Sequence, residues 1–204
     1  MSLRVVQWEP ILDALIPSQR TCDCGASDAA PVHPLGELER RAAERYLAAH
    51  DALTGLPNSA SFEGELQGAI DAARRYELLP AVLVIDLDGF AAINDTYGQA
   101  VGDHHLQRIA VALEETARRG DTVARIGGDE FAILLPNATS HAAHDAAVRF
   151  ARTVEQLESV SPGSTASVGV AIFVPGDTPE TMLARADADM YDVKRARQLA
   201  CWPA

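Results

Sequence analysis

Two short stretches of the chain place carboxylates where they could take part in chemistry. The first, VIDLDGF, puts Asp86 and Asp88 two residues apart at the end of a continuous apolar run. In a strand, residues at this spacing point to the same side. A carboxylate at the end of a buried strand is costly unless a partner compensates it, and a divalent cation is a usual partner. The alternative is that both acids begin a turn and cap the next helix, where Asp is favoured.

The second stretch, ARIGGDEFAILL, puts Gly127, Gly128, Asp129 and Glu130 between two apolar runs. A Gly-Gly pair in this setting predicts a two-residue hairpin turn, because both turn positions need a positive φ. Glycines also let a phosphate approach backbone N–H groups, and acids beside a phosphate need Mg²⁺ between them. Taken alone, the stretch favours a plain hairpin turn with two solvated acids.

Together, the two stretches favour a metal site. If the strand at 81–87 pairs beside the hairpin, Asp86, Asp129 and Glu130 converge at one edge of a sheet. Three converging carboxylates without a cation would be strongly destabilising. We therefore predict a divalent cation at this edge.

These carboxylates need a scaffold, which the hydrophobic periodicity predicts. Helical patterns alternate with short β-branched runs, as in a single sheet with helices packed on it, of the α/β or ferredoxin-like α+β class. The predicted helices cover 36–53, 59–79, 100–119, 140–158 and 178–198, and the predicted strands cover 81–87, 122–126, 131–136 and 164–174.

Composition restricts the class of partner. The 204 residues are 48% hydrophobic, which suffices for one well-buried domain. The net charge of −12 argues against a nucleic-acid or anionic-membrane surface, although metal ions could still hold a small nucleotide. The spacing of Cys22 and Cys24 disfavours a zinc site with His33. We find no signal peptide and no membrane-length apolar run, so the expected location is cytoplasmic.

Five motifs resemble the GGDEF domain, the catalytic domain of bacterial diguanylate cyclases. They are DALTGLPN (51–58), DLDGFAAINDTYGQAVGD (86–103), RIGGDEF (125–131), SVGVA (167–171) and ARADADMYDVKRA (184–196), in the family's order. The resemblance implies an α+β fold with a central, mainly antiparallel sheet and flanking helices, of the ferredoxin-like, nucleotide-cyclase palm type. It places the GGDEF domain at 51–204, after an N-terminal segment or linker of unknown role (1–35) and a connecting signalling helix (36–50). That helix could pair with a copy of itself or dock on its own domain.

The resemblance also implies an activity. Diguanylate cyclases join two GTP molecules into cyclic di-GMP and release two pyrophosphates, working as a homodimer. By motif, Asp86, the carbonyl of Leu87, Asp129 and Glu130 would hold two Mg²⁺ or Mn²⁺ ions per active site. Asp129 and Glu130 would be the catalytic acids.

The substrate-binding residues implied by the resemblance are Asn94, Asp103, Gly127, Gly128 and Lys194. The two glycines would lie against the nucleotide. Asn94 and Asp103 match the guanine readers, and their chemistry favours GTP over ATP, although Asn94 could instead cap a helix. Lys194, the only lysine of the chain, would contact the triphosphate.

Arg118 and Asp121 form the RxxD arrangement, which in the family is an inhibitory site for the product cyclic di-GMP. Arg can bind a phosphate or stack on guanine, while Asp can pair with the guanine edge. Charged residues are also common where a helix turns into a strand, which is the alternative interpretation.

Three positions depart from the family pattern. Ser59 stands where Arg is usual, Ala91 where Lys is usual, and Gln198 where Arg is usual. The changes at Ala91 and Gln198 remove positive charge from the phosphate side, and Arg195 or Arg197 could substitute. The alternative function is therefore a weakly active or inactive module that binds GTP or cyclic di-GMP and signals through a partner. We expect the paired histidines at 104–105 and 141–144 to be exposed and not metal ligands.

Overall fold

The computed structural model describes residues 34–157 and 165–200 of the chain, which separates into two compact units, Met1–Ala48 and Ala49–Ala204. The described part of the first unit belongs to helix α2 (Pro34–Ala49), whose last residue is the first of the second unit. Its ion pairs join Arg41 to Glu37 at 2.5 Å and Arg40 to Glu44 at 3.5 Å, at the spacing of successive helical turns. The helix ends before residue 53, the predicted end. Cys22, Cys24 and His33 lie outside the described residues.

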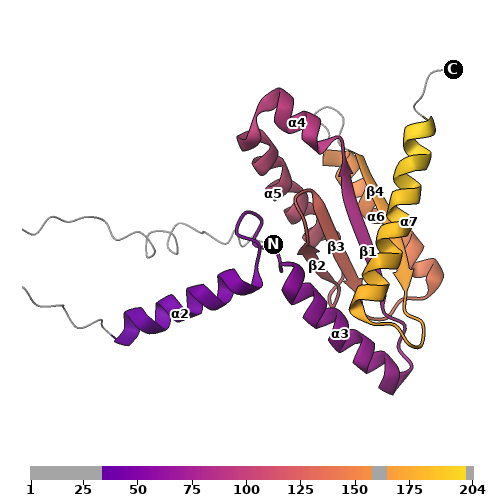
Figure 1. Cartoon of the computed structure of the whole chain (residues 1–204), viewed down its shortest axis with the longest axis horizontal. Helices are drawn as coiled ribbons and strands as arrows, with labels where there is room; N and C mark the ends of the chain where they lie inside the picture. The colour runs from indigo at the N-terminus through magenta and orange to yellow at the C-terminus, as the bar shows by residue number, and fades with distance from the viewer. Residues whose placement is uncertain (1–33, 158–164, 201–204) are drawn as a thin grey trace, which may run out of the picture. The chain divides into compact units, whose positions relative to one another are not determined.

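The second unit contains one four-stranded sheet with helices around it (Figure 1). The strand order is β2-β3-β1-β4, and every neighbouring pair is antiparallel. This confirms the α+β prediction over the α/β alternative. The elements are α3 (Ser59–Tyr76), β1 (Ala81–Asp88), α4 (Phe90–Tyr97), α5 (Gln99–Thr116), β2 (Thr122–Arg125), β3 (Glu130–Leu135), α6 (Ser140–Gln156), β4 (Thr165–Ile172) and α7 (Pro179–Ala200).

The central strand β1 separates two hydrophobic cores. Its residues are buried on both faces, which explains the continuous apolar run in the sequence. Leu83 and Ile85 pack in a core with α5 and α6, whereas Val82 and Val84 pack in a second core with α3 and α7. In Figure 1, α7 accordingly lies in front of the sheet and α6 behind it. Because side chains alternate along a strand, Asp86 falls on the face that α7 covers.

Gly169 lets α7 lie directly on β4. A Cβ at this position would lie 2.7 Å from the Cα of Met190 and still closer to the Met190 nitrogen and the Ala186 carbonyl. Ala186 and Met190 are buried in the core between α7 and the sheet. The glycine of the SVGVA motif therefore sets how closely α7, which also carries Lys194, approaches the sheet.

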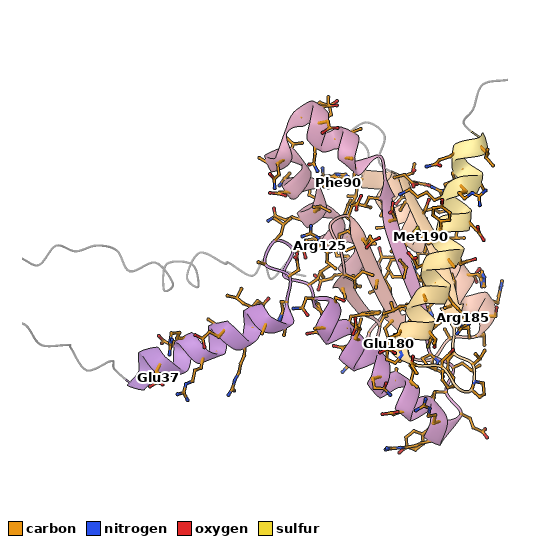
Figure 2. All side chains as sticks on the ribbon, in the orientation of Figure 1. Glu37, Phe90, Arg125, Glu180, Arg185 and Met190 are labelled. Carbon is orange, nitrogen blue, oxygen red and sulfur yellow. The ribbon has the colours of Figure 1, made fainter. Side chains whose placement is uncertain are left out.

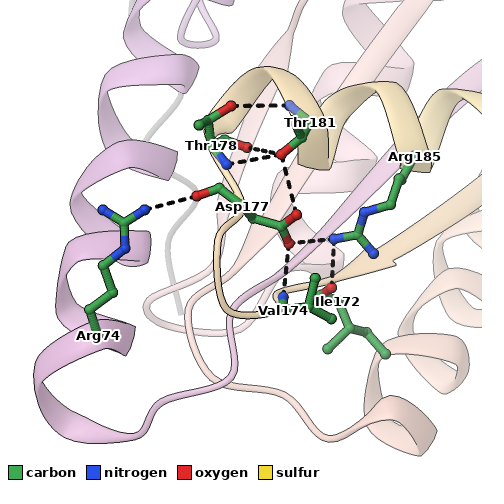
Figure 3. Close-up of polar contacts among 7 residues, drawn as sticks. All are labelled: Arg74, Ile172, Val174, Asp177, Thr178, Thr181 and Arg185. Atoms are coloured by element: carbon green, nitrogen blue, oxygen red, sulfur yellow. Dashed lines mark hydrogen bonds and ion pairs between the residues drawn. The ribbon is translucent and has the colours of Figure 1, made fainter.

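Asp177 fixes the turn between β4 and α7 (Figure 3). This carboxylate is 6% exposed and forms an ion pair with Arg185 at 2.5 Å. It also accepts hydrogen bonds from the Val174 N–H at 2.8 Å and the Thr181 hydroxyl at 3.2 Å. The Arg74 guanidinium on α3 donates to the Asp177 carbonyl at 2.9 Å. The cluster ties α3 to the start of α7 at the end of the sheet where β1 begins.

Helix α4 was not among the predicted elements. It has only eight residues and lies between two glycines with left-handed φ, Gly89 at 80° and Gly98 at 85°. Such φ values are accessible to glycine and strained for most other residues. The two glycines let the chain turn out of β1 into α4 and again into α5, so one long motif becomes two helices.

Candidate active site

The predicted acidic cluster lies at the end of β1. Asp86 on β1 is the register partner of Glu130 on β3, so two acids stand opposite each other on neighbouring strands. Asp129 precedes Glu130, and its carbonyl accepts a hydrogen bond from the Leu87 N–H at 3.2 Å. Lys194 reaches this cluster from α7, with its Nζ 2.5 Å from the Asp86 carboxylate. The strand pairing on which the metal-site prediction depended is present.

Negative charge predominates in this cluster, where several carboxylates surround one lysine. Burial raises the pKa of the Glu130 carboxyl, and the negative charges of Asp86, Asp129 and Asp187 raise it further, while Lys194 opposes them. Burial would lower the pKa of Lys194, but its hydrogen bond with Asp86 and the surrounding carboxylates raise it. Lys194 is therefore held as a cation, and more negative charge surrounds it than it can neutralise.

Asp88 has a different role from Asp86. Its carboxylate accepts hydrogen bonds from the Thr165 hydroxyl at 2.8 Å and the Ser167 hydroxyl at 2.9 Å on β4. Arg197 lies 3.6 Å away. The alternative interpretation, in which the acids cap the next helix, is wrong, because α4 begins after Gly89 without a side-chain cap. Asp88 instead ties β1 to its neighbour strand.

The Gly-Gly loop differs from the predicted turn. Neither Gly127 nor Gly128 has a left-handed φ, so the two-residue turn with two positive φ values is wrong. Strand pairing stops at Arg125 and Phe131, and the N–H groups of Ile126 and Gly127 both donate to the Glu130 carbonyl, at 3.0 and 3.3 Å. The loop is wider, and its glycines serve a purpose other than a tight turn.

Space around the loop explains the glycines better. A Cβ on Gly127 would make the Glu130 carboxylate shift, whereas a Cβ on Gly128 would have nothing within 4 Å. Gly127 therefore leaves room for an acid of the cluster. Gly128 is exposed and leaves its backbone open to a ligand, as expected for a residue that lies against a nucleotide.

Arg125 is a component that sequence reasoning missed. Its guanidinium donates to the Gly128 carbonyl, at 2.6 Å from Nη2 and 3.2 Å from Nε, and its Nη1 donates to the Asp51 carboxylate at 2.9 Å (Figure 2 labels Arg125). Both residues stood inside quoted motifs, DALTGLPN and RIGGDEF. Charge complementarity between these motifs was the available signal, but nothing in the spacing showed that the two meet.

A cleft of about 470 Å³ opens beside the acidic cluster. It brings together four of the predicted substrate and catalytic residues, Asn94, Asp103, Gly128 and Asp129. Lys194, Asp86 and Glu130 are not among its lining residues. The remaining lining residues are Phe90, Ala91, Asp95, Gln99, Leu106 and Arg125.

Asn94 lines the cleft with a side chain whose oxygen end is buried. It lies within α4 and not at its start, so the helix-capping alternative is wrong. Its Oδ1 is buried, and no described residue donates a hydrogen bond to it. A Cβ on Gly102 would collide with this amide, so the glycine makes room for Asn94 beneath the cleft. Asp103 follows Gly102 and is half-buried at the start of α5.

The oxygen donors of the acidic cluster suit a divalent metal that brings some of its own ligands. Residues 34–157 and 165–200 contain no group of three His, Cys, Asp or Glu side chains already arranged to hold an ion. Mg²⁺, however, usually takes only one or two protein carboxylates and completes its shell with water and substrate phosphates. The donors here are hard oxygens, and burial together with the charges of Asp86, Asp129 and Asp187 raises the pKa of Glu130. The donor set therefore fits a cation that arrives with a nucleotide.

Arg118 and Asp121 lie outside this cleft and close their own turn. The Arg118 N–H donates to the Asp121 carboxylate at 2.9 Å, and the Asp121 N–H donates to the Arg118 carbonyl at 3.0 Å. Gly120 between them has a φ of 101°. The Arg118 side chain is exposed, so the turn presents a guanidinium to solvent.

Two of the departures from the family pattern, Ala91 and Gln198, lie in different surroundings. Ala91 lines the cleft, and Gln198 is exposed on α7. Of the two candidate substitutes, Arg197 pairs with Asp88 and Glu155 at 3.6 and 3.5 Å, whereas Arg195 lies over the Tyr191 ring at 5.9 Å. Arg197 therefore pairs with an acid at the end of β1, whereas the contact given for Arg195 is with an aromatic ring on its own helix.

The expectation for the histidines holds for His104, His141 and His144, which are exposed. It is wrong for His105, which is 3% exposed in the buried stripe of α5 and has an Nε2 without a hydrogen-bond partner among the described residues. The apolar positions around it, Gly102, Leu106 and Ile109, follow the same helical period and were the missed signal.

The sheet order and surrounding helices are those of a nucleotide-cyclase palm-type domain, as in the similar solved structures. Within this class, the chain belongs to the GGDEF family: the family model described as "Diguanylate cyclase, GGDEF domain" matches residues 48–199.

Similar proteins include the diguanylate cyclase TpbB of Pseudomonas aeruginosa, which is 41% identical over 163 residues, covering 77% of this chain and 38% of TpbB. The diguanylate cyclase VdcA of Vibrio cholerae is 36% identical over 154 residues, covering 72% of this chain and 44% of VdcA. This chain therefore spans less than half the length of these curated relatives.

Solved structures agree with this assignment. The coiled coil and GGDEF domain of DgcB from Caulobacter crescentus, in complex with c-di-GMP, gives a TM-score of 0.69 at 28% identity, covering 79% of this chain and 91% of that one. The isolated GGDEF domain of TpbB gives a TM-score of 0.62 at 42% identity, covering 72% of this chain and 89% of that one.

Within the described residues, no helix combines the length and apolar character needed to cross a membrane.

Proposed function

We propose that this domain condenses two GTP molecules into cyclic di-GMP and releases two pyrophosphates. The observation that carries the proposal is the cleft that joins Asn94, Asp103, Gly128 and Asp129, next to the cross-strand acids and Lys194. Its polar residues suit a purine base, and its acidic edge suits phosphates bound through cations.

Guanine recognition is assigned to two side chains of the cleft. The Asp103 carboxylate accepts from the N1–H and N2–H groups of guanine, and the Asn94 amide donates to N3. The buried Oδ1 of Asn94 favours this use of the amide nitrogen, because the acceptor end is turned into the protein. Adenine lacks the two donors that Asp103 would bind, so ATP leaves a half-buried carboxylate unpaired.

The acidic edge is assigned to metal binding and to the reaction. Asp86, the Leu87 carbonyl, Asp129 and Glu130 would hold two Mg²⁺ or Mn²⁺ ions. Such ions lower the pKa of an attacking hydroxyl and neutralise charge on the phosphates. Lys194 adds a fixed cation beside the phosphates, and the open backbone of Gly128 lets the nucleotide approach.

The reaction requires two copies of the domain. Each 3′-hydroxyl attacks the α-phosphate of the other nucleotide, so two protomers, each with one GTP, must face each other in a homodimer. The exposed guanidinium of Arg118, with Asp121, is assigned to binding the product cyclic di-GMP outside the cleft, where it inhibits the enzyme.

Incubation of the full chain with GTP and MgCl₂, followed by chromatographic separation of the nucleotides, tests this function. We expect cyclic di-GMP from GTP, none from ATP, and none from Asp129→Asn. Asp145→Asn, which changes an exposed acid on α6, is the matched control and should retain activity. Absence of product at high protein concentration, for the wild type and Asp129→Asn alike, would refute the proposal.

A second function is favoured by one observation. Among the described residues that line the cleft, the only cationic side chain is Arg125, which is already bound to Asp51 and Gly128. A domain with few free cations at its phosphate side could bind nucleotides and signal without turnover. Calorimetry with cyclic di-GMP distinguishes the two: tight binding that Arg118→Ala abolishes, without product from GTP, supports the binding module.

A further inference from the structure

Arg125 holds the backbone of the Gly-Gly loop from one side. Two of its nitrogens donate to the Gly128 carbonyl, at 2.6 and 3.2 Å, and the third donates to Asp51 at 2.9 Å. The Arg125 side chain is only 12% exposed, and its bond to Asp51 is partly buried, whereas its bonds to the Gly128 carbonyl are exposed. A planar guanidinium fixed at both ends has a defined orientation, and so does the carbonyl that it binds.

Asp51 is itself fixed before it meets Arg125. Its Oδ1 accepts the Thr54 N–H at 2.9 Å and the Thr54 hydroxyl at 2.7 Å, and its backbone carbonyl accepts the Gly55 N–H at 2.9 Å. Burial would raise the pKa of Asp51, but the hydrogen bonds from Thr54 and Arg125 hold it below its usual value. The carboxylate is therefore a rigid, charged anchor, and it does not line the cleft.

Backbone hydrogen bonds close the base of the loop, where the N–H groups of Ile126 and Gly127 donate to the Glu130 carbonyl, but they do not reach the Gly128 carbonyl. A Cβ on Gly128 would contact nothing within 4 Å, so packing does not fix this peptide. Arg125 binds the carbonyl that precedes Asp129, and the Leu87 N–H binds the carbonyl of Asp129 itself at 3.2 Å. Because peptide groups are planar, two fixed carbonyls fix the direction of the Asp129 Cα–Cβ bond, from which its carboxylate extends.

We propose that Asp51, acting through Arg125, is a positioning residue for Asp129. The segment that directly follows α2 thereby controls the geometry of the proposed catalytic acid, although Asp51 touches neither the cleft nor the acidic cluster. This inference rests on the proposed cyclase function.

Kinetics of Asp51 variants with GTP and Mg²⁺ test the inference. Asp51→Ala should lower kcat roughly tenfold to a hundredfold, because small misplacements of a reacting group cost this much. The KM for GTP should stay within about threefold, because ground-state binding is not the interaction removed. Asp51→Asn, which keeps an acceptor for Arg125, should recover part of kcat. In an Arg125→Met background, Asp51→Ala should cause no further loss, because its effect passes through Arg125.

Arg74→Met is the matched control. Arg74 also donates its guanidinium to a backbone carbonyl, that of Asp177, but at the opposite end of the sheet. It should leave kcat unchanged. Loss of kcat in Asp51→Ala no larger than in Arg74→Met, or full additivity of Asp51→Ala with Arg125→Met, would overturn the inference.

Hydrogen exchange read by mass spectrometry supplies a readout that does not need turnover. Asp51→Ala should speed exchange at the amides of Leu87 and Gly127, which close the loop, and Arg74→Met should not. Unchanged exchange at these amides overturns the inference even if kcat falls. If the wild type makes no cyclic di-GMP, the proposed function fails, and the exchange result alone decides whether Asp51 positions the loop.

Discussion

Gly169→Ala gives the sharpest test of how α7 is placed. The added methyl group would meet the Ala186 carbonyl, the Met190 nitrogen and the Met190 Cα, the last at 2.7 Å. All three are backbone atoms of a packed helix and cannot rotate away as a side chain would. Overpacking of a well-packed core costs about 1–3 kcal/mol. For a domain of this size, that corresponds to a fall of about 2–12 °C in Tm.

Thermal melting monitored by circular dichroism checks this fall in Tm, with Gly68→Ala as the matched control. Gly68 lies exposed in α3, and a Cβ there has nothing within 4 Å. The same substitution should therefore stabilise the protein by about 0.4–1 kcal/mol, through reduced freedom of the unfolded chain. Because Lys194 lies on α7 one turn after Met190, Gly169→Ala should also weaken GTP turnover. A Tm within about 1 °C of the wild type for Gly169→Ala would refute the reasoning.

Two further predictions concern buried polar groups. Asp177→Asn should lower the free energy of unfolding by about 1–3 kcal/mol, because a charged acceptor of several hydrogen bonds is lost. The midpoint of urea unfolding measures this change. An unchanged midpoint would contradict the stabilising role assigned to the Asp177 contacts. Burial, then the charges of Arg108 and His104, lower the pKa of His105 from 6.5, so the unfolded chain binds this proton more readily. The wild type should lose stability relative to His105→Leu as pH falls through 6.5, and a pH-independent difference in urea midpoint between the two would contradict this.

The sequence predicted those parts of the fold that local pattern determines. The apolar run of β1 and the helical periods of α3, α5, α6 and α7 are properties of contiguous residues. The pairing of β1 with the hairpin was inferred only as a condition, and the observed register of Asp86 with Glu130 satisfies it. Helix α4 escaped prediction because it has eight residues, too few for its period to stand out beside the motif that contains it.

The parts of the site that escaped prediction depend on contacts between distant residues. Arg125 and Asp51 are 74 positions apart, and nothing local to either one shows that they meet. The Gly-Gly pair was assigned a tight turn because turn statistics describe isolated hairpins. Here a Cβ at Gly127 would press on the Glu130 side chain and make its carboxylate shift. This contact is local, at i and i+3, but the turn statistics do not describe it, so the local rule gave the wrong reason for the glycine.

The acidic end of the sheet leads to a last prediction, on the stability of the metal-free protein. Glu130 stands opposite Asp86, and like charges at directly paired strand positions are destabilising by about 0.2–1 kcal/mol. Burial and the charges of Asp86, Asp129 and Asp187 all raise the pKa of Glu130, so the folded state resists its ionisation. Glu130→Gln removes this repulsion. It should raise Tm by about 0.4–4 °C in buffer containing a chelator.

Asp86→Asn should have the opposite sign, although it removes a charge from the same pair. Lys194 binds Asp86 at 2.5 Å, whereas no cation among the described residues forms an ion pair with Glu130. The Asn variant therefore leaves the partly buried Lys194 without its carboxylate. A fall in Tm for Asp86→Asn beside a rise for Glu130→Gln would show that Lys194 compensates one acid and leaves the other to a metal ion. Mg²⁺ with GTP should then stabilise the wild type more than either variant, because each variant lacks one of the charged carboxylates proposed to bind the ion. Two shifts of the same sign would contradict this division of charge, since the two substitutions differ chiefly in which acid the lysine holds.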